Sequence, residues 1–364
     1  MKILHISDLH LGKIVNGFSM IEDQEYILDQ VLTTIESESI DTLVIAGDVY
    51  DRAIAPVEAI ELWDDFLISV SKLKVTVLII NGNHDSMKRL NFASKLLETN
   101  NIHIVSTDKL FEQITIDKVN FFLLPFLSLE LASSLLDTKI NDFTILKQEI
   151  IKLIDIDESE TNIIIDHSYI ITGNSDIEAD SAIRPLALGG SEFTKGEVYN
   201  QFDLVLAGHV HRHSHIRPNI YYSGSILPYS SAERNNRQGY YIHQVGDTIT
   251  STYHTFDLKH PMREVAIYLQ QIDEQLYSED YIIIKLLDEG QIINPLEKIR
   301  TKFPNVMQID REFRHLEINN TGESISDKLE TSFADFYSLN SDQEISDDKL
   351  NYFLKVANDV IGGE

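Results

Sequence analysis

The sequence predicts an α/β fold in which two sheets pack as a sandwich flanked by helices, followed by a small α+β unit and a helical C-terminal segment. Two observations support this. Short β-branched runs alternate with amphipathic helical patterns, and two later strands lie close together around a turn. The 364 residues are 43% hydrophobic and 24% charged, which is typical of a globular chain and excludes a disordered or fibrous one.

Six short apolar runs in the first two-thirds of the chain have the length and composition of buried strands. They are Ile3–Ile6, Thr42–Ile45, Val75–Ile80, Asn162–Ile165, Asp203–Leu206 and Ile220–Tyr222. Helical periodicity separates several of them and predicts helices over 22–35 and 57–70. We expect Tyr26 and Ile60 on the apolar faces of these two helices.

Strands are also predicted at 240–245 and 251–256, on either side of Gly246-Asp247. A Gly-Asp pair between two such runs is typical of a β-hairpin. We expect this hairpin to belong to the second sheet of the sandwich.

The pattern changes near His260-Pro261. Beyond it come strands at 263–268, 281–286 and 306–312 and a helix at 295–303. The last 44 residues carry 10 acidic and 3 basic residues, and two apolar stripes there predict two amphipathic helices. The stripes are Ile325, Leu329, Phe333 and Phe336, then Leu350, Phe353, Leu354, Ala357 and Ile361. We therefore expect three parts: 1–260, an α+β domain over 261–320, and a helical segment over 321–364.

Composition narrows the class of protein further. The absence of cysteine excludes disulfides and thiolate-based zinc sites and fits the cytoplasm. The first ten residues include His5, Asp8 and His10, so we expect no apolar signal core there. The apolar runs are far shorter than the ~20 residues a membrane helix needs, so we expect no membrane association. With 30 basic against 58 acidic residues, the net charge of −28 excludes a general basic surface for nucleic acid.

Polar side chains with ligand chemistry follow directly after five of the predicted strands. They are Asp8 and His10, then Asp48 and Asp51, then Asn83, His84 and Asp85, then His167, and finally His209 and His211. Ligands bind at the carboxyl ends of strands in α/β folds. The pattern therefore predicts one converging site.

The residue types indicate a metal site. Carboxylate, amide and imidazole donors without thiolate suit Mn²⁺, with Mg²⁺, Fe²⁺ or Zn²⁺ as alternatives. Because residues i and i+2 of an extended segment point the same way, we expect Asp8 and His10 to share an ion, and His209 and His211 likewise. The seven candidate ligands suit two ions: Asp8, His10, Asp48, Asn83, His167, His209 and His211. Asp48 is the best bridging candidate, and two such ions form the clamp used for in-line displacement at phosphorus.

Each motif alone also has a structural explanation. Asn81-Gly82 is a common turn signal, and Gly208-His209-Val210-His211 could be a surface loop. His5 lies inside the first predicted strand, where we expect a core histidine with satisfied hydrogen bonds. The functional interpretation rests on five signals in order, each at a strand end.

As a set these motifs resemble the signature of the calcineurin-like metallophosphoesterases. The motifs are Asp8-x-His10, Gly47-Asp48-x-x-Asp51, Gly82-Asn83-His84-Asp85, His167 and Gly208-His209-x-His211. The flanking segments 2–13 and 222–233 resemble the SbcD family, the nuclease subunits of bacterial SbcCD complexes. The resemblance covers essentially the whole chain and implies a two-sheet metallophosphoesterase sandwich with a capping domain near 262–320.

This resemblance also implies an activity and partners. The expected enzyme is a Mn²⁺-dependent 3′–5′ double-strand DNA exonuclease and single-strand or hairpin endonuclease in DNA repair and recombination. Its expected partner is an SbcC-type coiled-coil ATPase, on which the C-terminal segment docks. A homodimer within a heterotetramer would form through helices at 57–73 and 87–98, although Trp63 and Phe66 could equally be ordinary core.

By the same resemblance, Asp8, His10, Asp48 and His211 hold one ion, and Asp48, Asn83, His167 and His209 hold the other. His84 would contact the phosphate and help to protonate the leaving oxygen, a role that suits an imidazole near neutral pH. We expect Asp51 and Asp85 to orient neighbouring groups. Asp166 departs from the common pattern and is expected to add negative charge beside the metals.

Arg52, Lys88, Arg89 and Arg212 are the candidate DNA contacts because they lie near the ligands in sequence. The main alternative is a small-molecule phosphodiesterase on the same two-metal scaffold. A second alternative is a non-catalytic protein that recruits the ATPase.

Overall fold

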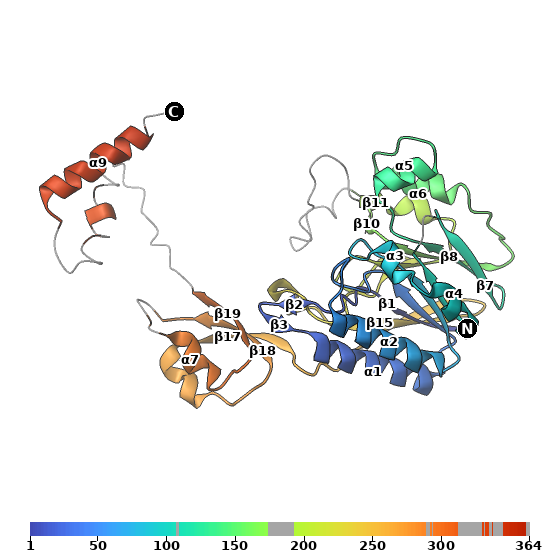
Figure 1. Cartoon of the computed structure of the whole chain (residues 1–364), viewed down its shortest axis with the longest axis horizontal. Coiled ribbons are helices and arrows are strands. Elements are labelled where there is room, and N and C mark those ends of the chain that lie inside the picture. Colours follow the sequence, from blue (N-terminus) through green and yellow to red (C-terminus); the bar gives the residue numbers. More distant parts are fainter. Residues whose placement is uncertain are drawn as a thin grey trace. The chain divides into compact units, whose positions relative to one another are not determined.

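The computed structural model describes residues 1–106, 109–173, 193–288, 292, 294–311, 330, 332–334, 337 and 345–361. Its contacts divide the chain into two units, Met1–Arg311 and Glu312–Glu364, and we describe each by itself. The first unit is built on two six-stranded sheets (Figure 1).

The first sheet is parallel at its centre and ends in an antiparallel hairpin. Its order is β16 (Ile249–Thr255), β15 (Gly239–Val245), β1 (Lys2–Ile6), β4 (Thr42–Ala46), β5 (Thr76–Ile80) and β6 (Ile102–Val105). β1, β4, β5 and β6 run parallel, and β15 pairs antiparallel with β1. The predicted hairpin is therefore confirmed, but its expected place is wrong. It extends the first sheet because β15 pairs with β1.

The second sheet has parallel inner strands and antiparallel edges. Its order is β13 (Ser214–Arg217), β14 (Ile220–Tyr222), β12 (Leu204–Gly208), β9 (Thr161–His167), β8 (Val119–Leu124) and β7 (Glu112–Ile116). The sequence patterns did not predict β6, β7 and β8. The half-exposed residues of β7 alternate with exposed ones, which leaves no continuous apolar run to detect.

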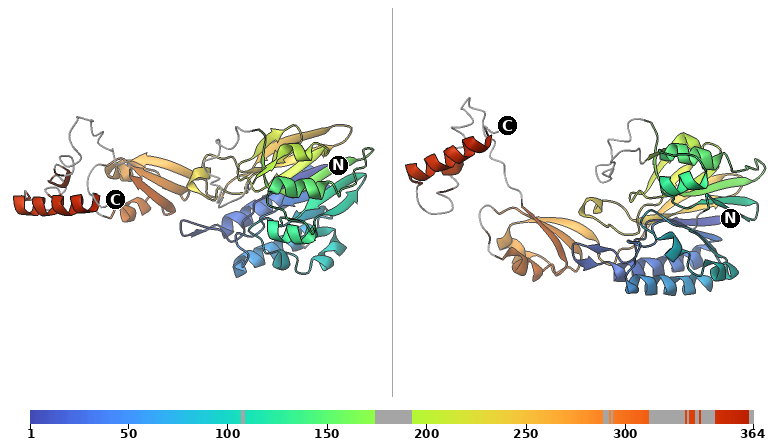
Figure 2. Two further views of the ribbon diagram at one scale, coloured as in Figure 1. Left: turned by 90° about the horizontal axis from the view of Figure 1, so that it is seen from above. Right: turned by 45° about the horizontal axis from the view of Figure 1, so that its top comes forward.

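Helices cover the outer face of each sheet (Figure 2). They are α1 (Ile21–Glu38) and α2 (Val57–Ser71) on the first sheet and α5 (Leu129–Leu135) and α6 (Phe143–Ile151) on the second. Ser128 and Asp142 cap α5 and α6 by accepting backbone N–H bonds at 3.3 and 3.0 Å. The result is a four-layer sandwich, which confirms the predicted fold class.

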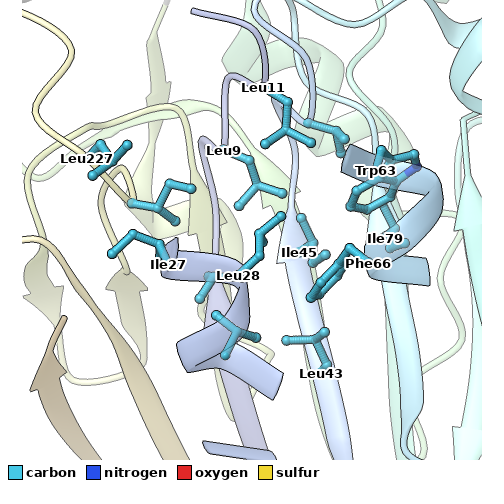
Figure 3. Packing of buried hydrophobic residues seen from close by; sticks show 14 of the residues in the cluster. Leu9, Leu11, Ile27, Leu28, Leu43, Ile45, Trp63, Phe66, Ile79 and Leu227 are labelled. Atoms are coloured by element: carbon cyan, nitrogen blue, oxygen red, sulfur yellow. The ribbon is translucent and has the colours of Figure 1, made fainter. Parts of the chain in front are cut away.

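Three apolar layers stabilise the sandwich, one between the sheets and one on the outer face of each sheet. Between the sheets, Ile3, Val44 and Leu78 pack with Phe121 and Ile163 from the opposite sheet. Figure 3 shows the layer outside the first sheet, where α1 and α2 pack against β1, β4 and β5.

The two helices turn slightly different faces to this layer than the sequence suggested. Tyr26 is 36% and Ile60 50% exposed, so their predicted burial is wrong. Gln24 and Ala59 are buried instead. Gln24 is buried because its side chain bonds backbone groups near the site. Trp63 and Phe66 are core residues.

His5 is buried between the sheets, as predicted for a core histidine. The backbone of Ala207 interacts with the His5 ring, but among the described residues neither ring nitrogen has a partner in hydrogen-bond geometry, so the expected full satisfaction is not met. Burial lowers the pKa of His5 to about 3, and the ring lies 5.7 Å from that of His243.

Shorter elements complete the main body. They are β2 (Ile14–Val15), β3 (Phe18–Ser19), α3 (Met87–Leu90), α4 (Ser94–Leu97), β10 (Tyr169–Ile171), β11 (Phe193–Lys195) and the 3-10 turns Glu98–Asn100, Gly196–Tyr199, Ser231–Glu233 and Leu269–Glu274. None of the described helices is long and apolar enough to cross a membrane.

A three-stranded parallel sheet follows the hairpin: β17 (Met262–Ile267), β18 (Tyr281–Leu286) and β19 (Val306–Arg311), with α7 (Pro295–Arg300). It has its own apolar core. Buried Asp23 of α1 joins it to the main body, because its carboxylate accepts from Tyr281 at 2.7 Å and lies 3.0 Å from His260. Residues 289–291, 293 and 312–320 of the α+β domain predicted over 261–320 lie outside the described residues.

In the second unit the structure describes α9 (Asp347–Ile361), as the second apolar stripe predicted. Of the other predicted stripe, Phe333 is described, whereas Ile325, Leu329 and Phe336 lie outside the described residues. Phe333 stacks on Phe353 at 3.7 Å between ring centroids. These rings border an apolar groove of about 610 Å³.

Candidate metal centre

The loops that follow β1 and β4 pair with each other through their backbones. The Asp8 N–H donates to the Gly47 carbonyl at 3.1 Å, and the His10 N–H donates to the Asp48 carbonyl at 2.9 Å. Asp8, His10 and Asp48 have φ values of 53°, 45° and 50°, in the left-handed region that non-glycine residues rarely adopt. Such backbone strain clusters at functional sites.

These φ values show that Asp8 and His10 do not share a site for the reason predicted, which was an extended backbone. Asp8 and His10 come together with His211, their ligand atoms lying within 4.8 Å of one another, but the segment is not extended. His209 also has a positive φ, 96°, and its side chain points to Asn83 instead of joining His211. The expectation that His209 and His211 share an ion is therefore wrong.

Asp48 lies at the centre of the cluster. Its Oδ2 is 3.3 Å from His167 Nε2 and 3.7 Å from His10 Nε2. These two imidazoles come from different sheets, so the carboxylate sits between two groups of candidate ligands. This is the position that a bridging ligand requires.

In the group of candidate ligands that includes residues of the second sheet, Asn83 contacts two histidines. Its Oδ1 lies 3.1 Å from His167 Nε2 and 3.0 Å from His209 Nδ1. His167 Nδ1 is 2.8 Å from the Ala46 carbonyl, which fixes the ring so that Nε2 faces the site.

On the other side, His10 Nε2 and His211 Nε2 face each other at 3.0 Å. Asp8 completes this group, and its carboxylate accepts the His209 N–H at 3.0 Å and the Ser7 hydroxyl at 2.5 Å. All seven predicted ligands thus lie in one cluster, in two groups that meet at Asp48.

Two glycines permit this close packing. A Cβ on Gly47, whose φ is 91°, would collide with the His167 ring at Nδ1. A Cβ on Gly82 would collide with the Asp48 carboxylate at Oδ1. Any side chain at either position would therefore displace a central residue.

The charges of the cluster are strongly coupled. Burial alone would raise the pKa of Asp48, but the neighbouring imidazoles of His167, His10 and His84 together lower that pKa. Burial would lower the pKa of His167, and Asp48 raises it to about 9. Burial lowers the pKa of His209 to about 3 and that of His10 well below its usual value.

His84 is exposed at the edge of this cluster. Its backbone N–H donates to Asp48 Oδ1 at 2.9 Å, and its Nδ1 lies 2.9 Å from the Asp51 carbonyl. With Nδ1 bound to a carbonyl, Nε2 is the ring atom left to act on a substrate. The ring meets His10 edge-on at 4.8 Å.

Asp85 and Asp51 support the loops. Asp85 accepts backbone N–H bonds from Gly82, Val49 and Tyr50 at 2.9 to 3.1 Å, which ties the turn after β5 to the loop after β4. Asp51 accepts from Lys13 at 2.6 Å and lies 3.8 Å from His10 Nδ1.

Glu233 belongs to the site although it was not among the predicted site residues. It is 9% exposed, and its carboxylate lies 3.2 Å from His211 Nδ1 while accepting the Tyr229 N–H at 2.9 Å. Burial opposes its charge, but the hydrogen bond with His211 lowers the pKa of Glu233. Its only sequence signal is its place at the end of the 222–233 segment.

Gln24 is a second residue that sequence reasoning did not place at the site. Its side chain binds the His10 carbonyl at 2.8 Å and the Gly12 N–H at 3.0 Å, so α1 holds the first metal loop.

Asp166 was expected to add charge beside the metals, and this expectation is wrong. Its carboxylate is buried on the opposite side of β9, where it bonds Lys147 Nζ at 2.5 Å, the Tyr199 hydroxyl and the Ser168 hydroxyl. Its charge is therefore neutralised by Lys147.

The candidate DNA contacts are all exposed. Arg52 bonds Asp51 at 3.3 Å, and Arg89 bonds the Ala53 carbonyl at 3.1 Å. Lys88 lies beside Arg89 in α3, and Arg212 lies between His211 and His213.

The donor set fits two divalent cations. Two imidazole nitrogens face each other at 3.0 Å next to buried Asp8, and Asp8, Asp48 and His167 form a second close group. Buried carboxylates and imidazoles in this arrangement are what a divalent ion of borderline softness prefers.

Comparison with known proteins agrees with this geometry. The calcineurin-like phosphoesterase family matches residues 1–213, which include all seven candidate ligands. The chain belongs to this family. It is also 33% identical to the SbcD component of nuclease SbcCD from Staphylococcus epidermidis, over 97% of this chain and 98% of that one. The Staphylococcus saprophyticus protein of the same name is 33% identical over 86% of this chain and 85% of its own length.

Similarity of this extent places the chain in the SbcD branch of the phosphoesterases. Among solved structures, a dimetal phosphatase from Danio rerio covers 70% of this chain and 96% of its own, at 12% identity and a TM-score of 0.41. A similarity at this TM-score and identity supports no functional conclusion.

Replacing Glu233 by Gln removes the charge that orients His211. Outer groups of this kind typically change metal affinity 10- to 100-fold, and we expect a loss in that range for Mn²⁺, measured by isothermal titration calorimetry. Glu197→Gln is the matched control, because Glu197 is exposed and its side chain bonds Arg217, away from the cluster. Equal affinities for the two variants would contradict the role of Glu233.

Proposed function

We propose that the chain is the nuclease subunit of an SbcCD-type complex. It would cleave DNA as a Mn²⁺-dependent 3′–5′ double-strand exonuclease and single-strand or hairpin endonuclease, together with an SbcC-type ATPase. The main support is that all seven candidate ligands lie in one cluster with His84 at its edge, in a chain similar to an SbcD protein over 97% of its length.

In this proposal Asp8, His10, Asp48 and His211 hold one ion, and Asp48, Asn83, His167 and His209 hold the other. When bound, two divalent ions would neutralise phosphate charge and lower the pKa of an attacking water. Mn²⁺ is the proposed ion because the set mixes hard oxygen with imidazole donors.

The side chains then have distinct tasks. The buried side chains of Asp8 and Asp48 supply carboxylate oxygens, which suit divalent cations. His84 donates a proton from Nε2 to the oxygen that leaves the phosphorus, because its Nδ1 is occupied by the Asp51 carbonyl.

Affinity for DNA is a separate question, because phosphate contacts usually come from Lys and Arg. In this chain the 58 acidic residues outnumber the 30 Lys and Arg residues, and the net charge of −28 opposes binding to phosphate. We propose that Arg52, Lys88, Arg89 and Arg212 make the local contacts and that the ATPase partner supplies most of the grip.

Partner contacts are proposed on two surfaces. The apolar groove beside α9 would bind the ATPase, since Tyr352 and Val356 are exposed there. Exposed apolar side chains on α2 and on the α3–α4 segment, including Ile60 and Phe92, would form a homodimer. Arg89 links the α3 segment to the loop before α2 through the Ala53 carbonyl.

His84→Asn tests the nuclease mechanism. Loss of a general acid typically costs 10²- to 10⁴-fold in rate, and we expect a loss of that size in Mn²⁺-dependent release of nucleotides from labelled DNA. Metal content should be unchanged, because His84 is not a proposed ligand.

Full turnover by His84→Asn with normal metal content would contradict its role. If the wild-type chain, with its partner and ATP, hydrolysed a small phosphodiester but no DNA, the function would instead be that of a small-molecule phosphodiesterase.

Val356→Asp tests the groove. A charge on an apolar contact surface should weaken co-purification with the ATPase at least about tenfold, since an unpaired charge is costly to bury. Asn351→Asp adds the same charge to an α9 residue that does not line the groove. Equal binding by both variants would exclude the groove as the docking surface.

A further inference from the structure

A small pocket opens directly beside the metal cluster. Its volume is about 140 Å³. Its lining includes Asn83, His167 and His209, the aromatic residues Phe126, Phe143 and Tyr169, and Ser168. Three proposed ligands therefore share a cavity with three aromatic rings to which the phosphate chemistry assigns no task.

The phenylalanine rings of this pocket are partly accessible. The rings of Phe126 and Phe143 stack with centroids 6.0 Å apart and an angle of 29° between their planes. Phe126 meets His167 edge-on at 6.5 Å. Both phenylalanines are only half-buried, so apolar ring surface remains available next to a polar site.

Both rings are anchored to the loops and strands that carry the metal ligands. The Phe126 N–H donates to the Asn81 carbonyl at 3.2 Å, and Asn81 Nδ2 donates to the Phe126 carbonyl at 3.1 Å. Asn81 begins the turn that presents Asn83. Phe126 and the amide ligand are therefore held at a fixed distance.

Phe143 is anchored through its helix. It is the first residue of α6, and Lys147 lies one turn later. Lys147 is 4% exposed and forms a 2.5 Å ion pair with Asp166, the residue before His167. This buried pair fixes the start of α6 against the strand that carries a proposed ligand.

We propose that this pocket receives one unpaired nucleobase of the substrate strand, stacked against Phe143 and Phe126. The proposal rests on the nuclease function proposed above and names the form of DNA that the site selects. A phosphate at the metal cluster brings its attached nucleoside to the pocket entrance, and the cavity has room for one ring system.

Stacking on aromatic side chains tolerates every base, because each base has a π-face. A paired base must first leave its duplex, which costs a few kcal/mol, whereas a base at a frayed end, a hairpin tip or a single strand pays little of this cost. The pocket therefore favours cleavage next to unpaired nucleotides without sequence preference.

The test uses the full chain with its ATPase partner, ATP, Mn²⁺ and single-stranded oligonucleotides. One nucleotide at a time is replaced by an abasic tetrahydrofuran residue, and kcat/KM is measured at each phosphate. Stacking is worth about 1–3 kcal/mol per base. We therefore expect a roughly 5- to 150-fold loss at one fixed position relative to the cleaved phosphate.

Phe143→Leu keeps apolar volume but removes the flat ring, so it should abolish most of this loss. Phe126→Leu serves as the second variant if Phe143→Leu fails to fold. Phe111→Leu is the matched control, since Phe111 is also half-buried on the same core but packs against Phe122 and lies outside the pocket. Metal content is measured for all variants.

A position-specific loss in the wild type and the control, absent from the pocket variant, supports the proposal. Equal abasic sensitivity in the folded pocket variant, or a wild type insensitive to abasic residues, overturns it while the nuclease function stands. A wild type that, with its partner and ATP, cleaves a simple diester but no oligonucleotide refutes the nuclease function, and this inference with it.

Discussion

The backbone pairing of the loops after β1 and β4 is the constraint on which the site depends. In these paired loops Asp8, His10 and Asp48 adopt left-handed conformations, and their side chains belong to the cluster at the strand ends. The second sheet then supplies His167 at the end of β9 and His209 directly after β12. Asp48 lies where the two sets meet, and glycines at 47 and 82 leave the space for it.

Much of this arrangement could be predicted from the sequence because buried parallel strands are recognisable as short β-branched runs. Strand ends in such a sheet gather at one edge, so ligand-type residues at five strand ends predicted the cluster without its geometry. The local conformation could not be predicted. Alternation in an extended chain suggested that His209 and His211 act together, whereas a positive φ at His209 sends them to different groups.

The remaining errors have a common origin in long-range contacts. Asp166 looked like an added charge at the site, but Lys147 of α6 neutralises it on the far side of β9. Glu233 and Gln24 support the ligands from distant parts of the chain, and only the fold brings them there. Tyr26 looked buried because periodicity alone does not reveal that Gln24 uses the buried face of α1 for hydrogen bonds. On α2 the buried face includes Ala59 instead of Ile60.

The charge distribution indicates that the candidate metal site and the surfaces that bind the rest of a substrate are different parts of the assembly. The site concentrates buried carboxylates and imidazoles that suit cations, while the chain as a whole is strongly acidic. In the proposed function, such a site would hold the reacting phosphate, and other surfaces would bind the rest of the DNA.

The most direct test of the central claim, a two-ion site bridged by Asp48, is electron paramagnetic resonance during Mn²⁺ titration of the full chain. The account predicts two ions per chain with a spin-coupled signal, and loss of that coupling in Asp48→Asn. A single ion per chain, or two uncoupled ions unaffected by Asp48→Asn, would contradict it.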